Sequence, residues 1–345
     1  MSTPTPTAPA HSTPPRSAPE AQSSSIKRRG LRLAPVSLPS AVTAGLLVLA
    51  IVANAALQST FFTLYSLTSN LATFVPLVFA ALAQAFVILG GGLDLSVGAI
   101  TALSSVTAMT VMGGDNTRIP LGILVALLTG VACGLLNGFI VGIVRLQPLI
   151  ATFGTASVFS GVTLLVLPTP GGTVPSGLTD TYRMAVGPLP VPLLLIVLCA
   201  LIWAVGRRTV FVRHLFAIGG NRDAAFASLV PVTGTMIASY AVAGGVAGFA
   251  ALAILANTGS GDPFIGADIA MNSIAACVLG GLALSGGRGS GYGALAGALI
   301  LSLISNILFF LGVPTTYRQL ASGLIIIAAL ALSVLSSKGG DAHER

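Results

Sequence analysis

Long apolar segments without charged residues alternate with short polar loops along most of the chain. No Asp, Glu, Lys or Arg occurs from Leu33 to Leu93, and uncharged runs of 19 or more residues recur after that. A helix of about 20 apolar residues can cross the hydrocarbon core of a bilayer. The pattern therefore predicts an all-α, polytopic integral membrane protein. We expect about ten transmembrane helices, near residues 40–58, 68–89, 95–112, 120–144, 149–167, 190–206, 232–255, 270–284, 292–312 and 320–336.

The positions of the basic residues orient these helices. With the N-terminus in the cytoplasm, 13 of the 16 Lys and Arg residues fall in the tails or the inner loops, and only Arg118, Arg183 and Arg318 lie outside. Basic residues collect on the cytoplasmic side of membrane proteins. Both termini are therefore predicted to be cytoplasmic. A third helix within residues 33–93 would reverse every later loop, so we expect two there, with their exact ends left open.

Composition divides the chain into three parts. Residues 1–35 are rich in Pro, Ser, Thr and Ala and have no apolar run, which is typical of a disordered cytoplasmic tail. Residues 36–338 form the predicted transmembrane domain, with a long cytoplasmic loop at 207–231. Residues 339–345 form a short cytoplasmic tail. The outer loop 168–189, rich in Pro and Gly, is expected to pack over the mouth of the bundle.

Composition also excludes several functions. With 54% hydrophobic and 7% charged residues and a mean hydropathy of +0.95, this is not a soluble protein. The net charge of +7 comes from basic residues that collect in the predicted cytoplasmic segments. These basic residues form no aromatic-lined groove of the kind that binds nucleic acid. Cys133, Cys199 and Cys277 lie in apolar runs, and we expect small buried residues rather than metal ligands or disulfides.

The spans lack the side chains that catalysis would need. The histidines, His11, His214 and His343, all lie in tails or a loop, so no embedded base or metal-ligand set is available. Neither lysine lies in a phosphate-binding loop. We therefore expect no enzyme activity, no metal and no cofactor on this chain, and any ATP must be used by another chain.

Glycines recur every four residues in several spans. The stripes are Gly130, Gly134, Gly138 and Gly142, Gly244 with Gly248, and Gly293 with Gly297. Small residues at this spacing let two helix backbones approach closely in a membrane. We expect these stripes to pack within the chain, a subunit interface being the alternative.

Two glycine-rich segments next to short spans resemble each other. GGLDLSVG (91–98) and GGLALSGG (280–287) match at six of eight positions, which suggests an internal repeat and broken helices. The gating or helix-break residues predicted from them are Gly91, Gly92, Asp94, Ser96, Ser285, Gly286, Gly287 and Arg288. Asp94 is interpreted as the cap of a helix starting at Leu95, with a role in gating or solute passage as the alternative and a proton relay less favoured. Polar residues inside the spans, Asn137, Thr152, Asn272 and Asn306, are candidates for the substrate pathway.

Four segments resemble one family. They are GGLDLSVGAI (91–100), NGFIVGIVRLQPLIATFGT (137–155), RHLFAIGGNRDAAFASLV (213–230) and MNSIAACVLGGLALSGGRGSGYGALAGA (271–298). Together they resemble the permease subunits of ribose-type (carbohydrate) ABC importers. The resemblance implies a multi-pass permease in the bacterial cell membrane that transports a monosaccharide or similar polar solute. It also implies three kinds of partner: ABC ATPase subunits that hold ATP and Mg, an extracytoplasmic substrate-binding protein, and a second permease copy in a homodimer or heterodimer.

The resemblance also implies a coupling helix in the loop 207–231. It assigns contact with the ATPase to Gly219, Gly220, Asn221, Ala224 and Ala225. Two segments depart from the family pattern. Ser228-Leu229-Val230 stands where the family has Ser-Gly-Ile, so the bend into the next helix does not follow from the resemblance. Ile269-Ala270-Met271-Asn272 lacks the two acids of the family's Tyr-Glu-Leu-Asp.

Other functions stay open at this point. An ATP-independent secondary transporter or channel would depend on Asp94 and an ion gradient. A permease of the same superfamily for branched-chain amino acids or nucleosides differs only in its solute. A membrane enzyme is disfavoured by the missing His and acid clusters.

Overall fold

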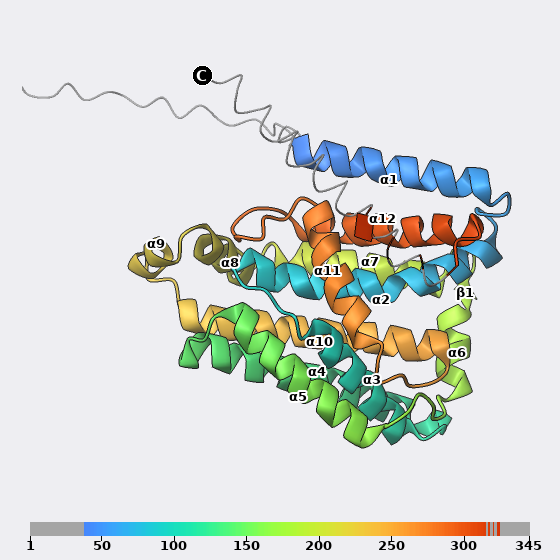
Figure 1. Cartoon of the computed structure of the whole chain (residues 1–345), viewed down its shortest axis with the longest axis horizontal. Coiled ribbons are helices and arrows are strands. Elements are labelled where there is room, and N and C mark those ends of the chain that lie inside the picture. The colour runs from blue at the N-terminus through green and yellow to red at the C-terminus, as the bar shows by residue number, and fades with distance from the viewer. Residues whose placement is uncertain (1–37, 315–316, 318–319, 321–322, 325–345) are drawn as a thin grey trace, which may run out of the picture. The chain divides into compact units, whose positions relative to one another are not determined.

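The computed structural model describes residues 38–314, 317, 320 and 323–324 (Figure 1). This part of the chain is a bundle of α-helices with one β-hairpin, whose two strands have two residues each. It agrees with the predicted all-α class. The predicted tails, 1–35 and 339–345, lie outside the described residues, as does most of the tenth predicted span, 320–336.

The first nine predicted spans each overlap one observed helix. The short helix α6 and the hairpin of β1 with β2 were not predicted, whereas α8 and α9 lie in the loop 207–231, where the resemblance implied a coupling helix. The helices are α1 (Leu38–Leu57), α2 (Leu64–Leu89), α3 (Val97–Met112), α4 (Ile119–Phe139), α5 (Pro148–Val166), α6 (Ser176–Arg183), α7 (Val191–Gly206), α8 (Val210–Gly220), α9 (Arg222–Ala227), α10 (Val232–Thr258), α11 (Gly266–Leu279) and α12 (Gly291–Phe310). A 3₁₀ turn (Asn116–Arg118) precedes α4, a π-helical turn (Ile140–Val144) follows it, and the strands are Ala185–Val186 and Leu189–Pro190.

Fewer helices than predicted are long enough to cross a membrane alone. Within the described residues, five apolar helical segments pass this length, and α7 with α8, bent by 77°, could form a sixth. The segment Ala41–Leu57 of α1 and the helices α3 and α11 are apolar but shorter than 18 residues. The 14 residues of α11 rise about 21 Å, less than the roughly 30 Å of a hydrocarbon core. Ten full spans are therefore not confirmed, whereas several membrane-spanning helices are.

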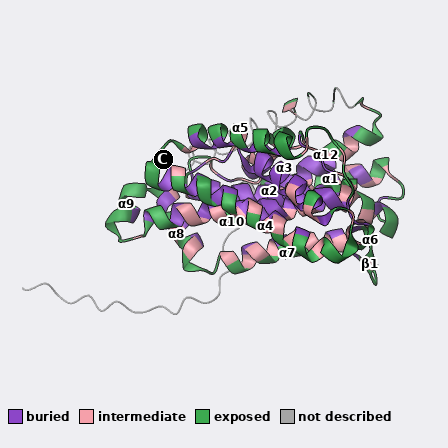
Figure 2. Cartoon of the chain, turned by 90° about the horizontal axis from the view of Figure 1, so that it is seen from below, coloured by how far each residue is buried: buried purple, intermediate pink, exposed green. Residues whose placement is uncertain are grey.

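Helix α2 occupies the centre of the bundle. From Val78 to Leu89 every side chain is buried, and α2 contacts α7, α10, α11 and α12. A helix that is apolar all round is buried on all sides. Outside this centre, α4 packs on α10, α5 on α3, and α1 on α12. Figure 2 shows the buried residues concentrated in the middle of the bundle and the exposed ones on α5 and α7.

The glycine stripes pack inside the chain, as predicted. A side chain on Gly130 would overlap the carbonyl of Gly244, and one on Gly134 would overlap the carbonyl of Tyr240. The stripe of α4 therefore seats α10 against it, backbone to backbone. In the same way, Gly293 and Gly297 of α12 meet the backbone of α11.

The two short helices α3 and α11 also meet through glycine. A side chain on Gly98, at the start of α3, would overlap the carbonyl of Gly266, at the start of α11.

The three cysteines are free and buried, as predicted. The outer loop 168–189 contains α6, whose buried Tyr182 donates a hydrogen bond to the carbonyl of Ala72 at 2.7 Å. This segment thus packs on the start of α2, at the end of the bundle opposite α8 and α9 (Figure 1).

Substitution Gly134→Ala should destabilise the bundle. The new methyl group has no room beside the Tyr240 carbonyl, and overpacking of this kind costs about 1–3 kcal/mol. Thermal unfolding in mild detergent, followed by size-exclusion chromatography, should show a lower midpoint. Gly154→Ala on α5 is the matched control, because nothing lies within 4 Å of that position and alanine favours a helix. Equal midpoints for the two variants would contradict this account of the packing.

Candidate functional site

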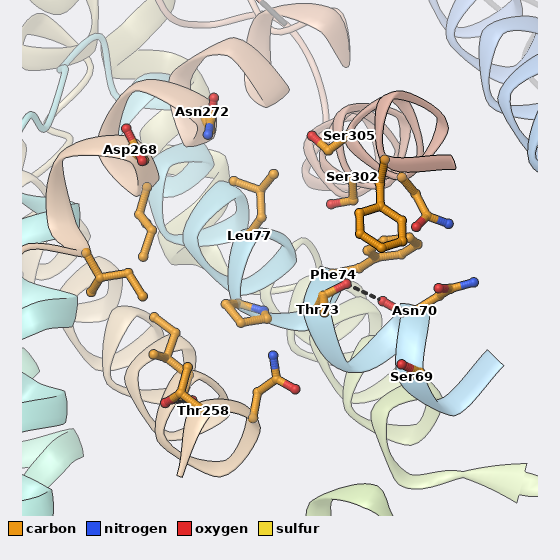
Figure 3. Close-up of a pocket in the computed structure, with 17 residues that line it drawn as sticks. Ser69, Asn70, Thr73, Phe74, Leu77, Thr258, Asp268, Asn272, Ser302 and Ser305 are labelled. Carbon is orange, nitrogen blue, oxygen red and sulfur yellow. Dashed lines mark hydrogen bonds between the residues drawn. The ribbon is translucent and has the colours of Figure 1, made fainter. Parts of the chain in front are cut away.

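A cavity of about 550 Å³ with a mixed polar and apolar lining lies among α2, α10, α11 and α12 (Figure 3). It is built from the first turns of α2 and the last turns of α10 and α12, so it lies toward the α6 end of the bundle. Its polar lining consists of Ser69, Asn70, Thr73, Asn257, Thr258, Asp268, Asn272, Ser302, Ser305 and Asn306. Its apolar lining includes Phe74, Leu77 and Phe309. The cavity combines amide and hydroxyl groups with aromatic faces, a combination that suits a polar organic solute.

Two of the four predicted pathway residues line this cavity. Figure 3 shows Asn272 with Asp268 on the α11 side and Ser302 with Ser305 on the α12 side. Asn306 also lines it, and its Nδ2 donates to Asn54 Oδ1 of α1 at 3.0 Å. Asn306 therefore has a structural partner as well as a place in the lining.

Sequence reasoning missed most of the polar lining. Asn257 and Thr258 of α10 were missed and are adjacent in the sequence. The other missed residues share helical spacing, which was the available signal: polar positions three or four residues apart lie on one helix face. They are Ser69, Asn70 and Thr73 on α2, Asp268 on α11, and Ser302 and Ser305 on α12. The polar face of each helix is visible only when these short intervals are compared across three spans.

The other two predicted pathway residues, Asn137 and Thr152, lie in a separate buried network. Asp94 Oδ1 accepts hydrogen bonds from Ser96 N at 2.8 Å and Ser96 Oγ at 2.6 Å. Asn137 Nδ2 donates to Ser96 Oγ at 2.7 Å, and Thr155 Oγ1 donates to Asn137 Oδ1 at 2.6 Å. The network therefore ties the segment before α3 to α4 and α5.

The same segment has its backbone satisfied by side chains. Leu95 N donates to Thr152 Oγ1 at 3.1 Å. With its amide oriented to match, Gln84 donates to the Asp94 carbonyl at 3.0 Å and accepts from Asp94 N at 3.2 Å. Irregular backbone inside a membrane bundle needs partners of this kind, because no water or neighbouring strand supplies them.

Asp94 caps the turn that leads into α3. The helix begins at Val97, two residues later than predicted, and the carboxylate accepts the N–H of Ser96 just before it. Asp94 is fully buried, and its Oδ2 has no hydrogen-bond partner within the described part of the chain. The hydroxyl of Tyr240, which lies against Gly92, is likewise unpartnered there. A role of Asp94 in gating stays a prediction.

The predicted coupling and gating glycines meet in one place, which we call the glycine junction: Gly91, Gly219, Gly220, Gly286 and Gly287. A Cβ on Gly286 would lie 2.6 Å from Gly91 Cα, and one on Gly287 would lie 2.5 Å from Gly220 N. Gly287 N also donates to the carbonyl of Leu89 at 3.1 Å. The end of α8 thus rests directly on the end of α2 and on the loop before α12.

Besides Asp94 and Ser96, three gating candidates lie outside the junction itself. Gly92 packs beneath the Tyr240 hydroxyl, whereas the side chains of Ser285 and Arg288 are exposed. The junction brings together three of the four loops that the charge distribution places on the cytoplasmic side: 90–94, 207–231 and 285–291.

Helices α8 and α9 follow one another at the end of the bundle (Figure 1). Asn221 separates them and caps α9, because its Oδ1 accepts from Ala224 N at 2.9 Å. Ala224 is exposed, whereas Ala225 is buried against the chain. Of the predicted alanine pair, only Ala224 is therefore available to a partner.

The bend after α9 is present despite the missing glycine. Leu229 has φ 60°, the left-handed conformation, and the chain turns there into α10. A side chain in this conformation costs about 1 kcal/mol relative to glycine. The departure from the family pattern thus changes the residue and not the turn.

The two similar glycine segments share a helix ending. Gly91 and Gly281 are both left-handed, and each helix closes with the same pair of backbone bonds: Gly92 N to Val87 O and Leu282 N to Cys277 O, each with a bond one residue inside. In the structure, Leu89–Gly91 corresponds to Leu279–Gly281, so that Gly91 is equivalent to Gly281. The sequence match instead pairs Gly91 with Gly280, one residue earlier. A larger internal repeat stays a prediction.

Comparison with known proteins gives a family. The family model described as "Branched-chain amino acid transport system / permease component" matches residues 66–330. The chain is 33% identical over 295 residues to the autoinducer 2 import system permease protein LsrD of Escherichia coli O9:H4 (strain HS), covering 83% of this chain and 89% of the relative. It is 37% identical over 261 residues to the ribose import permease protein RbsC of Bacillus subtilis (strain 168), covering 73% and 79%. No solved structure matches.

These matches extend across the cavity, the buried network and the glycine junction alike. They also confirm the family suggested by the four sequence segments, and they exclude the reading of the chain as an enzyme, because the relatives are transport components. The chain belongs to the permease component family of ABC import systems.

Proposed function

We propose that this chain forms the transmembrane path for a monosaccharide or similar polar solute, as one permease of an importer in a bacterial inner membrane. A substrate-binding protein delivers the solute on the outer side. ATP and Mg are bound by separate ATPase subunits on the inner side, and a second permease copy, identical or different, completes the membrane part. No bond of the solute is made or broken on this chain.

The chemistry of the cavity is the observation that carries this proposal. Four amide side chains, Asn70, Asn257, Asn272 and Asn306, and several hydroxyls line it. Such groups donate and accept hydrogen bonds, as a polyhydroxylated solute requires. Phe74 and Phe309 add aromatic faces for the apolar face of a sugar ring.

The family description makes a branched-chain amino acid the second candidate. Its carboxylate would need a cation or a helix N-terminus in the path. Among the described residues that line the cavity, none is Lys or Arg; the first turn of α11 does line it, but Asp268 in that turn is acidic and would oppose a carboxylate. The lining therefore favours a neutral polar solute. The printed names of the two relatives, a ribose permease and an autoinducer 2 permease, point the same way.

The glycine junction supports a route for the energy. The ATPase is proposed to grip α8 and α9, and α8 transmits its displacement through Gly219 to the ends of α2 and the loop before α12. Because no side chain separates these backbones, they move together. The far end of α2 lines the cavity, so a shift of α2 changes the opening of the path.

Substitution Asn272→Ala should lower the initial rate of sugar uptake about two- to tenfold, because one amide hydrogen bond contributes about 0.5–1.5 kcal/mol. Uptake of radiolabelled ribose, xylose and galactose, compared with leucine, measures both rate and solute class. Ser157→Ala on α5 is the control, since its hydroxyl bonds only to Phe153 of its own helix. Saturable uptake of leucine with none of any sugar would contradict the proposed solute.

Substitution Gly220→Leu should uncouple ATP hydrolysis from uptake without unfolding the permease. Nothing of the described chain lies within 4 Å of a Cβ there, so the new side chain meets only a partner. Uptake should fall about tenfold or more, equivalent to about 1.4 kcal/mol, while the unfolding midpoint stays unchanged. Gly219→Leu differs, because it overlaps the Leu89 carbonyl and should lower the midpoint as well. Normal uptake by the Gly220→Leu variant would refute the coupling assignment.

Substitution Asp94→Asn distinguishes a capping role of Asp94 from a role in ion-coupled transport. The amide oxygen can still accept from Ser96, so ATP-driven uptake in proteoliposomes without an ion gradient should be retained. Asp94→Ala removes the acceptor and should lower the unfolding midpoint, since a buried donor left unpaired costs about 1–3 kcal/mol. If the Asp94→Asn variant folds stably but loses uptake, and added ATP does not restore it, the result would instead support the ion-driven alternative.

A further inference from the structure

Two large apolar side chains project from the short helix α9 and the turn after it. Leu229 is 91% exposed, more than any other large hydrophobic residue in the described part of the chain, and Phe226 is 73% exposed. They lie beside Arg222 and Asp223, at the end of the bundle and not on a long apolar helix (Figure 1). They do not belong to the apolar face of a membrane-spanning helix, and adjacent exposed apolar groups rimmed by polar residues mark interaction surfaces.

Leu229 has a conformation that this chain elsewhere gives mostly to glycine; among the described residues the other exception is Arg145. Gly91, Gly113, Gly259, Gly281 and Gly312 each follow a helix in the left-handed conformation. Leu229 has the same conformation after α9, with φ 60°.

The backbone bonds at this turn are those of an ordinary glycine ending. Leu229 N donates to Phe226 O at 3.0 Å, and Val230 N donates to Ala225 O at 3.1 Å. Glycine would make these bonds with less strain. The leucine side chain adds strain and exposure, and it gains little burial within its own chain. Its benefit must come from outside the chain.

We infer that Leu229 and Phe226 form an apolar anchor that inserts into a pocket of the ATPase subunit, and that the rim of this pocket is acidic. This inference rests on the proposed function. The acidic rim is inferred from charge complementarity, because the segment around the anchor is basic. Residues 207–229 contain four arginines, Arg207, Arg208, Arg213 and Arg222, and the single acid Asp223. Apolar anchors surrounded by charged rims are the usual arrangement of such interfaces.

The anchor lies on an element through which the ATPase could displace the glycine junction. Helix α9 packs on α8 and α10, and its Ala225 is buried. Helix α8 ends in Gly219, whose backbone touches Leu89 and Gly287 in the glycine junction. An ATPase holding Leu229 thus holds the element that rests on α2.

The test separates binding from folding by using residues that accept a left-handed conformation. The permease is purified in nanodiscs, and the ATPase that co-purifies with the wild type is identified by its vanadate-sensitive activity and purified. Its affinity is then measured for the wild type and for Leu229→Gly, Leu229→Asn, Phe226→Ala and Leu229→Met. Glycine and asparagine both keep the turn.

We expect Leu229→Gly and Leu229→Asn to bind the ATPase about tenfold or more weakly, with unfolding midpoints equal to or above that of the wild type. Phe226→Ala should also bind more weakly, and Leu229→Met, which stays apolar, should bind nearly as well as the wild type. Unchanged affinity for both the glycine and asparagine variants would overturn the anchor and leave lipid contact as the use of the pair. If no ATPase accompanies even the wild type, the proposed function itself fails, which is a different result.

Discussion

Backbone groups that leave a helix inside a membrane bundle must find partners within the protein, and this constraint shapes the centre of the molecule. The chain leaves α2 at Leu89 and does not resume a helix until Val97. Between them, Gln84 and Thr152 bond the backbone of residues 94 and 95, and the Asp94 carboxylate bonds that of Ser96. A break of this kind is tolerated only where protein surrounds it. The polar residues inside the spans are therefore divided between two tasks, holding the break and lining the cavity.

Glycine performs the complementary task of bringing backbones into contact. At the junction of α8 with the end of α2 and the loop before α12, a side chain on Gly219, Gly286 or Gly287 would force the segments apart, and one on Gly98 would do the same at the crossing of α3 with α11. Direct backbone contact leaves little compliance, because interiors are close-packed and transmit displacement. The elements proposed to feel ATP and those that line the solute cavity are thus joined by a short rigid path, through α8 and then along α2.

Sequence patterns predicted the helices well and their roles less well. Uncharged apolar runs located nine of the helices, and the four-residue glycine spacing predicted close packing within the chain without naming the partner helix, because both are properties of a single segment. Asn137 and Thr152 were grouped with Asn272 and Asn306, since a polar residue in an apolar span looks the same whether it bonds a broken backbone or faces a cavity. Only the three-dimensional arrangement separates these pairs. The tertiary meeting of Gly91, Gly219 and Gly286 was equally beyond reach, because these residues are far apart in the chain.

The same reasoning explains why Leu229 says more about function than a better-behaved residue would. Where local preference, burial and packing agree, a residue is explained by the fold alone. Leu229 contradicts both local preference and burial at once, in a turn that other helices of this chain close with glycine. Ala225, one turn earlier, satisfies the fold by being buried, although the resemblance assigned it to a partner. The surface that a partner meets is therefore better located by the residues that the fold does not need than by those that a motif names.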